Sequence, residues 1–191
     1  MSARHTVIGS PVGPLTLVGD GSALTGLYFD GHLRTPRLAD RGPRTDEGFG
    51  LAARQLAEYF AGTRREFDLE LAPHGSLFER QVWALLTKIP YGETRTYGQL
   101  AAELGDPGAA QAVGNANGWN PISIIVPCHR VVGASGSLTG YAGGLHRKRF
   151  LLSWKSRRQP MTAGCSDPVS RLGRRGDRSP SASASPCASL A

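Results

Sequence analysis

Cysteine is scarce in this chain of 191 residues, which has only Cys128, Cys165 and Cys187. These form neither a Cys-x-x-Cys pair nor a cysteine–histidine spacing suited to zinc, so we expect no disulfide framework and no metal site. The chain also lacks any run near the roughly 20 apolar residues that a membrane span needs. Its first residues lack the apolar core of a signal peptide. We therefore expect a cytoplasmic protein with reduced thiols and no membrane contact.

Acidic residues are fewer than basic ones, with 15 Asp and Glu against 22 Lys and Arg and a formal net charge of +7. Excess positive charge suits an anionic partner such as nucleic acid. Residues 156–191 hold six arginines against two aspartates, however, so the rest of the chain supports such a partner only weakly. That segment is otherwise rich in Ser, Pro and Ala. It can bury too little surface to repay the entropy of ordering, which predicts a disordered tail.

Residues 1–73 predict a small α/β domain. Three short apolar runs separated by Gly and Pro turns are typical of strands, at residues 7–8, 15–18 and 24–29. The polar residues 30–46 read as a loop, after which Asp46 is placed to cap a helix that Gly62 ends. The predicted apolar face of this helix comprises Phe49, Ala53, Leu56, Tyr59 and Phe60.

Residues 74–155 predict a helical domain. SLFE at 76–79 and TYGQ at 96–99 have the pattern of capping boxes, each of which starts a helix. Gly105 ends the second helix, and Asp-Pro at 106–107 starts a third one immediately. Two short helices joined by so tight a turn predict a helix-turn-helix.

The third of these helices is built almost entirely from small residues: Gly108, Ala109, Ala110, Ala112, Gly114 and Ala116. Each Gly weakens a helix by roughly 1 kcal/mol relative to Ala, so some benefit must offset the loss. Close approach to another surface, such as a narrow DNA groove, is one such benefit. Tight packing against a neighbouring helix is another, and the residues alone favour neither.

The continuous apolar run 122–126 predicts a buried strand that leads into Pro-Cys-His-Arg at 127–130. A lone cysteine after a buried strand is usually a small core residue. Here the following histidine offers a base that favours the thiolate, the form in which cysteine is a nucleophile. Both interpretations of Cys128 stay open at this point. The glycine-rich segments 133–136 and 140–144 suit the loops of a wing.

The stretch NPISIIVPCHRV at 120–131 resembles the active-site signature of the O6-alkylguanine-DNA alkyltransferases. The similarity continues through IPYGETRTYGQLA, PGAAQAVGNANG and GSLTGYAGGLHRKRFLL, so it spans about residues 76–152. Several motifs in the same order make the resemblance specific. The N-terminal residues are compatible with the family's variable α/β domain but carry no diagnostic motif.

The resemblance implies an α+β fold, in which a small ribonuclease-H-like α/β domain (1–73) precedes a helical winged helix-turn-helix catalytic domain (74–155). It implies DNA repair by direct, single-turnover transfer of an alkyl group from O6-alkylguanine to Cys128. The expected enzyme class is methylated-DNA–[protein]-cysteine S-methyltransferase. The small-residue helix would enter the minor groove, and the damaged base would leave the stack because a thiolate cannot reach it in line inside a duplex. We expect a monomer that binds duplex DNA and needs no cofactor.

The resemblance also assigns roles to single residues. Cys128 would accept the alkyl group, His129 would draw off its proton through a water, and Asn120 would hold the turn. Tyr97 would touch the DNA backbone and assist protonation of the departing guanine, although a core aromatic at a helix start is the ordinary alternative. The expected substrate- and DNA-binding residues are Gln111, Ala112, Gly114, Asn115, Arg130, Tyr141, Ala142 and Gly143.

Two residues depart from the family's usual pattern. Gln111 stands where an arginine usually fills the gap left by the flipped base, and it brings no charge and less stacking surface. Lys155 stands where a glutamate usually orients the histidine, and a lysine disfavours the imidazolium that accompanies the thiolate. Both departures predict slower transfer. The second coincides with the change of composition toward the tail.

Three alternative functions were compared. A lesion-binding relative that flags alkylated guanine without repairing it would typically have Trp in place of Cys128. A winged-helix transcription regulator would present long polar side chains to the major groove, which the small-residue helix lacks. A cysteine hydrolase would turn over many times. The sequence leaves open which alkyl sizes fit and whether O4-alkylthymine is accepted.

Overall fold

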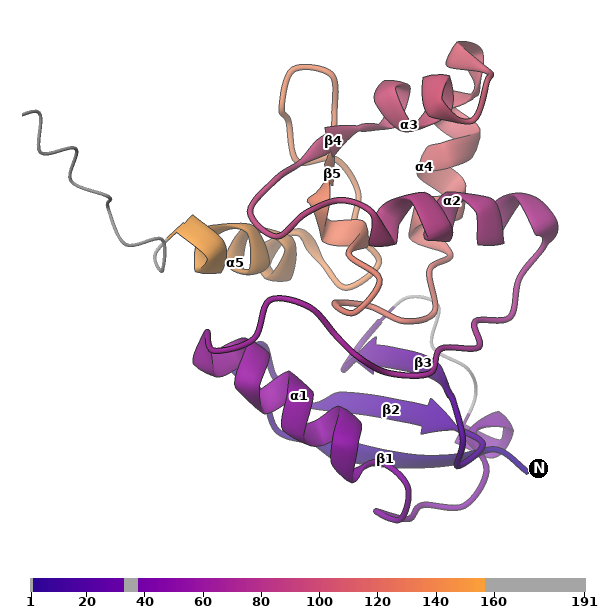
Figure 1. The fold of residues 1–191 in the computed structure, drawn as a ribbon, viewed down its shortest axis with the longest axis vertical. Coiled ribbons are helices and arrows are strands. Elements are labelled where there is room, and N and C mark those ends of the chain that lie inside the picture. Colours follow the sequence, from indigo (N-terminus) through magenta and orange to yellow (C-terminus); the bar gives the residue numbers. More distant parts are fainter. Residues whose placement is uncertain (1, 33–37, 157–191) are drawn as a thin grey trace, which may run out of the picture. The chain divides into compact units, whose positions relative to one another are not determined.

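The N-terminal part is built on a three-stranded antiparallel sheet (Figure 1), formed by β1 (Arg4–Ile8), β2 (Leu15–Gly19) and β3 (Leu24–Phe29) in that order. The register pairs Ile8 with Leu15 and Leu15 with Phe29. The structure, a computed structural model, describes residues 2–32 and 38–156, without the side chains of 38, 39, 155 and 156. The predicted tail therefore lies outside the described residues, apart from the backbone of Ser156.

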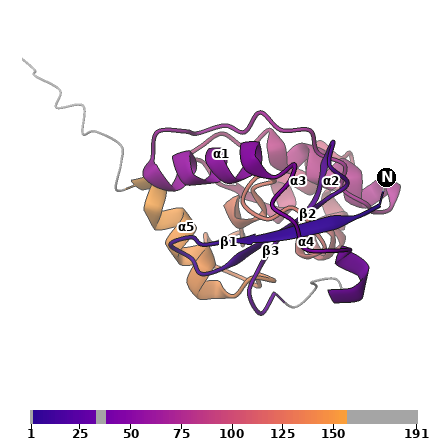
Figure 2. The ribbon, with the colours of Figure 1, turned by 90° about the horizontal axis from the view of Figure 1, so that it is seen from below.

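Helix α1 (Gly50–Ala61) lies along one face of this sheet, as Figure 2 shows. Its buried residues include Leu56, Tyr59 and Phe60, as the apolar pattern predicts, but Ala52 is buried where Ala53 was expected. The helix ends at Gly62, whose φ of 79° is the left-handed conformation that glycine adopts without strain.

The prediction that Asp46 caps this helix is wrong. The residue before the first helical turn is Phe49, and no side chain caps there. The Asp46 carboxylate instead accepts a hydrogen bond from the hydroxyl of Thr6 on β1. The chain makes one further turn after Asp46, in which the N–H of Phe49 donates to the backbone carbonyl of Asp46. This extra turn carries the carboxylate away from the helix end. Before it lies a short 3-10 helix, η1 (Leu38–Arg41), within the predicted loop.

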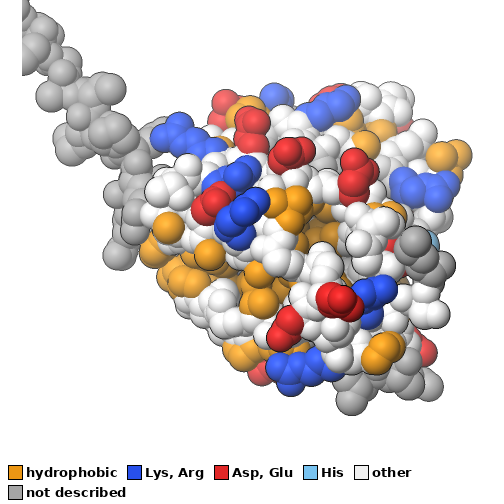
Figure 3. All heavy atoms as spheres, turned by 60° about the horizontal axis from the view of Figure 1, so that its bottom comes forward, with side chains coloured by type: hydrophobic (Ala, Val, Ile, Leu, Met, Phe, Trp, Pro, Cys, Tyr) orange, Lys and Arg blue, Asp and Glu red, His pale blue; other side chains and the backbone are white. Residues whose placement is uncertain are grey.

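Charged side chains of both signs are interspersed on the face seen in Figure 3, which views the molecule from the side of the N-terminal strands. Acidic and basic residues alternate there with exposed apolar patches. This face offers no continuous basic surface of the kind that follows a DNA backbone.

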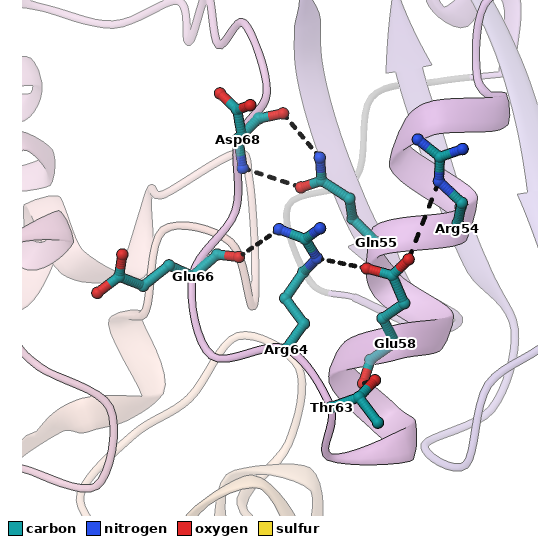
Figure 4. A network of polar contacts seen from close by, with 7 residues as sticks. All are labelled: Arg54, Gln55, Glu58, Thr63, Arg64, Glu66 and Asp68. Carbon is teal, nitrogen blue, oxygen red and sulfur yellow. Dashed lines mark hydrogen bonds and ion pairs between the residues drawn. The ribbon is translucent and has the colours of Figure 1, made fainter.

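Polar contacts tie the segment after α1 back onto the helix (Figure 4). The buried amide of Gln55 donates to the carbonyl of Asp68 at 2.8 Å and accepts from its N–H at 2.9 Å. Arg64 pairs with Glu58 at 2.6 Å between Nε and Oε2. These contacts fix the path by which the chain leaves the sheet toward the helical part.

The helical part begins as its capping boxes predict. Ser76 and Glu79 cap α2 (Leu77–Thr87) reciprocally, and Thr96 and Gln99 do the same for α3 (Tyr97–Glu103). Asp106 then caps a 3-10 turn, η2 (Pro107–Ala109), which continues into α4 (Ala110–Gly118). Helices α3 and α4 pack together as the predicted helix-turn-helix. The indole Nε1 of Trp83 on α2 donates to the carbonyl of Ala116 at 2.8 Å, and this hydrogen bond joins α2 to α4.

The strand predicted at 122–126 is not formed, although its residues are buried. The segment makes a compact turn in which Ile124 has a φ of 71°. It touches the sheet only as an isolated bridge between Leu27 and Ile122. An apolar run reports burial but not backbone geometry, and the Asn120 side chain here supplies hydrogen bonds that a neighbouring strand would otherwise provide.

The chain then forms a 3-10 turn, η3 (Cys128–Arg130), and β5 (Val131–Val132), which pairs in parallel with β4 (Arg95–Thr96). The glycine-rich residues that follow lead into α5 (Leu145–Ser156). Fully buried side chains from both parts of the chain, such as Leu27, Leu86 and Leu151, belong to one core. No helix among the described residues is long and apolar enough to cross a membrane.

Candidate active site at Cys128

Cys128 lies at the start of η3 with only 4% of its surface exposed. Its Sγ is 4.0 Å from the hydroxyl oxygen of Tyr141, which comes from the glycine-rich segment before α5. His129 follows directly and is fully buried. The thiol is therefore held in a tight turn and faces a loop that arrives from a later part of the chain.

The side chain of Asn120 bridges the backbone of the turn that precedes the thiol. Its amide donates to the carbonyl of Val126 at 2.9 Å, and its Oδ1 accepts from the N–H of Ile122 at 3.0 Å. Asn117 on the buried side of α4 donates to the carbonyl of Cys128 at 3.4 Å. The sequence reasoning missed Asn117, for which the only signal was a polar residue on the apolar face of α4.

Lys148 is a second residue that the sequence reasoning missed. It is fully buried, and its Nζ donates to the carbonyl of Thr139 at 3.0 Å. Its spacing from Leu151 on α5 placed it on the buried face, which was a usable signal. A lysine on such a face must find a polar or charged partner, because an uncompensated buried ammonium is costly.

The pKa of the Cys128 thiol reflects opposing influences. Burial raises it, whereas hydrogen bonding from Asn120 and Tyr141 and the charge of Lys148 lower it. Burial also disfavours the charged form of Lys148 and so lowers the pKa of this ammonium, whereas the neighbouring Cys128 raises it. Desolvation raises the pKa of Tyr141 well above its usual range, so this phenol stays neutral near pH 7.

A cavity of about 420 Å³ opens between α3, α4 and the residues before α5. It brings together most of the predicted substrate-binding residues and adds Thr139. Its lining comprises Tyr97, Ala110, Gln111, Gly114, Asn115, Gly118, Thr139, Gly140, Tyr141 and Ala142. We call residues 139–144 the pocket loop. The Tyr97 hydroxyl lies 3.5 Å from the Thr139 hydroxyl, so the aromatic spans the mouth between helix and loop.

Helix α4 has two faces that correspond to the two interpretations of its small residues. Val113, Ala116 and Asn117 are buried against the core, whereas Gln111, Ala112 and Asn115 are exposed. A Cβ on Gly114 would lie 3.6 Å from the Tyr97 ring, which is ordinary contact. Small residues thus serve packing on one side and leave a smooth exposed surface on the other.

Three predicted site residues lie elsewhere. Arg130 is buried away from the cavity, where its guanidinium donates to the carbonyl of Ile89 and sits 5.7 Å from the centre of the Tyr91 ring. Gly143 belongs to the pocket loop but is buried against Phe29 and does not line the cavity, and Ala112 is exposed beside the cavity. The side chain of Lys155 lies outside the described residues. Within those residues, no three His, Cys, Asp or Glu side chains gather as a metal site requires.

Fold and site together define a class: α+β proteins in which a small sheet domain precedes a helix-turn-helix, with a buried thiol beside a pocket on the second helix. Two family models match this chain. That of the 6-O-methylguanine DNA methyltransferase DNA-binding domain covers residues 77–156, and that of its ribonuclease-like domain covers residues 3–73. The chain belongs to the 6-O-methylguanine DNA methyltransferase family.

Similar proteins carry the corresponding name. The methylated-DNA–protein-cysteine methyltransferase of Mycobacterium tuberculosis is 54% identical over 158 residues, which are 82% of this chain and 94% of that protein. Its counterpart from Methanosarcina acetivorans is 50% identical over 78% of this chain and 95% of its own length. The crystal structure of Mycobacterium tuberculosis OGT in complex with DNA matches with a TM-score of 0.77 at 54% identity, covering 82% of this chain and 95% of that one.

Proposed function

We propose that this protein repairs DNA by moving a methyl or larger alkyl group from O6-alkylguanine onto its own Cys128. The observation that carries the proposal is the buried Cys128 thiol, held by Asn120 and facing Tyr141 at 4.0 Å beside a cavity on the helix-turn-helix. Membership of the family supports the same chemistry. Because nothing in the site removes a thioether, each molecule acts once.

The exposed face of α4 meets the DNA, and the damaged nucleotide turns out of the stack into the cavity. The absence of bulky side chains at Ala112 and Gly114 supports close approach of the helix backbone to a groove. Gln111 and Asn115 supply hydrogen bonds at the rim. The partner in this proposal is duplex DNA that contains O6-alkylguanine.

The transfer is a direct displacement. His129 draws off the thiol proton through a water, and the charge of Lys148 favours the resulting thiolate. An electron pair of the sulfur forms a new bond to the first carbon of the alkyl group, as the bond between this carbon and the guanine O6 breaks. The electrons of the broken bond pass to guanine, which takes a proton with the help of Tyr97. The products are an S-alkyl Cys128 and an intact guanine.

The remaining expectations belong to the same proposal. We place the ribonuclease-like domain at residues 1–73 and the DNA-binding and alkyl-acceptor domain at 74–155. The family matches at residues 3–73 and 77–156 support this division. We propose that the protein acts as a monomer in the cytoplasm and uses no cofactor.

Intact mass after incubation with excess duplex containing O6-methylguanine tests the proposal. We expect a gain of one methyl group in the wild type and none in Cys128→Ala, and the unmodified duplex serves as the second control. No gain, with selective binding to the damaged duplex retained, would sink the repair function and favour a lesion-binding protein.

A further inference from the structure

Arg147 in the first turn of α5 joins two segments that are far apart in the sequence. Its Nε donates to the carbonyl of Val12 at 3.0 Å, and its Nη1 donates to the carbonyl of Gly143 at 2.9 Å. Val12 lies in the turn between β1 and β2, whereas Gly143 belongs to the pocket loop. A single guanidinium thus fastens the pocket loop to the N-terminal sheet domain.

Phe29, the last residue of β3, forms a floor under the same loop. It is 1% exposed, and the Cζ of Arg147 lies 5.2 Å from its ring centroid. The Tyr141 ring lies 5.9 Å away, centroid to centroid. A Cβ on Gly143 would come within 2.4 Å of the Phe29 ring, so the loop backbone rests directly on it. Glycine at this position permits that contact.

The turn that receives Arg147 is itself held firmly. The hydroxyl of Ser10 donates to the carbonyl of Gly13 at 2.6 Å and accepts from the N–H of Val12 at 3.2 Å. The N–H of Gly13 closes the turn on the carbonyl of Ser10 at 3.0 Å. The Val12 carbonyl is therefore a fixed acceptor, and the guanidinium transmits its position to the loop.

These contacts determine where one wall of the cavity stands. Tyr141 lines the cavity and also lies 4.0 Å from the Cys128 sulfur, so outward movement of the loop would widen the space at the thiol. Such movement would break the hydrogen bond from Arg147 to the Gly143 carbonyl and remove the contacts of the loop with Phe29. A charge-assisted bond to a carbonyl is among the stronger hydrogen bonds in proteins.

We infer that Arg147 is a positioning residue: with Phe29 it ties the pocket loop to the N-terminal domain and thereby limits the size of alkyl group that Cys128 accepts. The inference rests on the proposed repair function. It gives the N-terminal domain a defined part in substrate selection, although none of the residues described in that domain lines the cavity.

Single-turnover transfer rates on duplexes carrying O6-methylguanine or O6-benzylguanine test the inference. Arg147→Met keeps the length of the side chain but removes its donors. We expect its methyl transfer to fall about tenfold, within the range that small misplacements of reacting groups cost. We expect its benzyl-to-methyl rate ratio to rise about threefold or more, because a looser loop admits the larger group.

Matched variants separate positioning from general destabilisation. Arg149→Met removes the same charge from an exposed position two residues along the same helix, and its ratio should equal that of the wild type. Arg147→Lys retains one donor and should give an intermediate ratio. Phe29→Leu should also raise the benzyl-to-methyl rate ratio. In the double variant, Arg147→Met should raise this ratio by less than it does in the wild-type background, because both residues hold the same loop. An Arg147→Met variant that melts earlier but keeps the wild-type ratio would overturn the inference. If it does not fold, the ratio in Arg147→Lys decides.

A DNA-independent measurement distinguishes this inference from the repair function itself. Iodoacetamide and its N-benzyl analogue alkylate free thiols, and peptide mass reports their rates at Cys128. Arg147→Met should react faster with the bulky reagent, relative to iodoacetamide, than the wild type does. Equal relative rates in the two proteins would overturn the positioning role of Arg147. If the variant and the wild type differ in this way but the wild type transfers nothing from DNA, the repair function alone is refuted.

Discussion

Around Cys128, burial and local charge act against each other. Burial raises the pKa of the thiol, and the positive charge of the fully buried Lys148 lowers it. A thiol kept neutral would be inert, whereas a nearby ammonium favours the nucleophilic thiolate. The sequence motif predicted Cys128 as the acceptor and His129 as its base, whereas the signal for Lys148 was its spacing from Leu151 on α5.

Replacing Lys148 by Met should therefore raise the pKa of Cys128 further. Without the ammonium, less thiolate is present at pH 7, and we expect alkyl transfer to slow by about tenfold, which corresponds to about 1.4 kcal/mol in the barrier. The pH profile of Cys128 alkylation by iodoacetamide should move to higher pH. Lys88→Met, at an exposed position on the end of α2, should leave the profile in place. An unmoved profile in Lys148→Met would contradict this account.

Gln111 is exposed on α4 and lines the cavity, which suits a residue that fills the gap left by a flipped base. Arginine there would add charge and stacking surface. We expect Gln111→Arg to raise the transfer rate about fivefold, which corresponds to about 1 kcal/mol from an exposed cation–π contact. Single-turnover kinetics measure this, with Gln111→Ala as the control that should be slower than the wild type.

We expect Lys155 to affect the protonation of His129 and not the binding of DNA. A glutamate at this position would favour the imidazolium that accompanies the thiolate. We expect Lys155→Glu to accelerate transfer several-fold, in the range of up to about 1 kcal/mol that solvent-exposed charge pairs contribute. An unchanged rate would show that residue 155 does not act on the site.

At the scale of elements, the turn 120–128 is where the sequence interpretation failed. Its apolar residues predicted a strand because continuous apolar runs and buried strands have the same composition. The backbone instead reverses, and one asparagine satisfies the groups that a strand neighbour would have paired. The starts of α2 and α3, by contrast, were predictable, because capping boxes act through contacts only three residues apart.

Asn120→Ala should test how much this turn depends on one side chain. It removes the partner of the buried N–H of Ile122 and one of the two donors to the carbonyl of Val126, which keeps the N–H of Cys128. We therefore expect the free energy of unfolding to fall by about 2–3 kcal/mol. Chemical denaturation measures this. Asn120→Asp keeps the acceptor but loses the donor, and it should also be destabilised. Wild-type stability in both variants would mean that the turn forms without Asn120.

At the scale of the whole molecule, the N-terminal and helical parts share one core, and Tyr59 of α1 lies where they meet. Its ring is fully buried and stands 6.2 Å from that of Tyr91, centroid to centroid, at the start of the segment leading to α3. Burial raises the pKa of Tyr59 to about 12, and the charge of the buried Arg130 opposes this. The folded protein therefore depends on a neutral phenol at this junction.

This dependence predicts a loss of stability in alkali. The unfolded phenol releases its proton near its ordinary pKa of 10.0, whereas the folded one retains it to about 12. The contribution is complete below pH 10 and disappears as the pH rises toward 12, at a cost of about 2 kcal/mol. Unfolding free energies of Tyr59→Phe should decline less over this interval than those of the wild type. Parallel declines would contradict the assignment.

The sequence by itself determined the family, the capping boxes of α2 and α3 and the strands of the sheet, because each rests on a local motif or a short-range periodicity. Only the tertiary structure decided that Arg130 is buried against Tyr91, that Lys148 stands near the thiol, and that Arg147 joins Val12 to the pocket loop. These are contacts between residues up to 135 positions apart. Local patterns cannot specify them, because such neighbours are chosen by how the whole core packs.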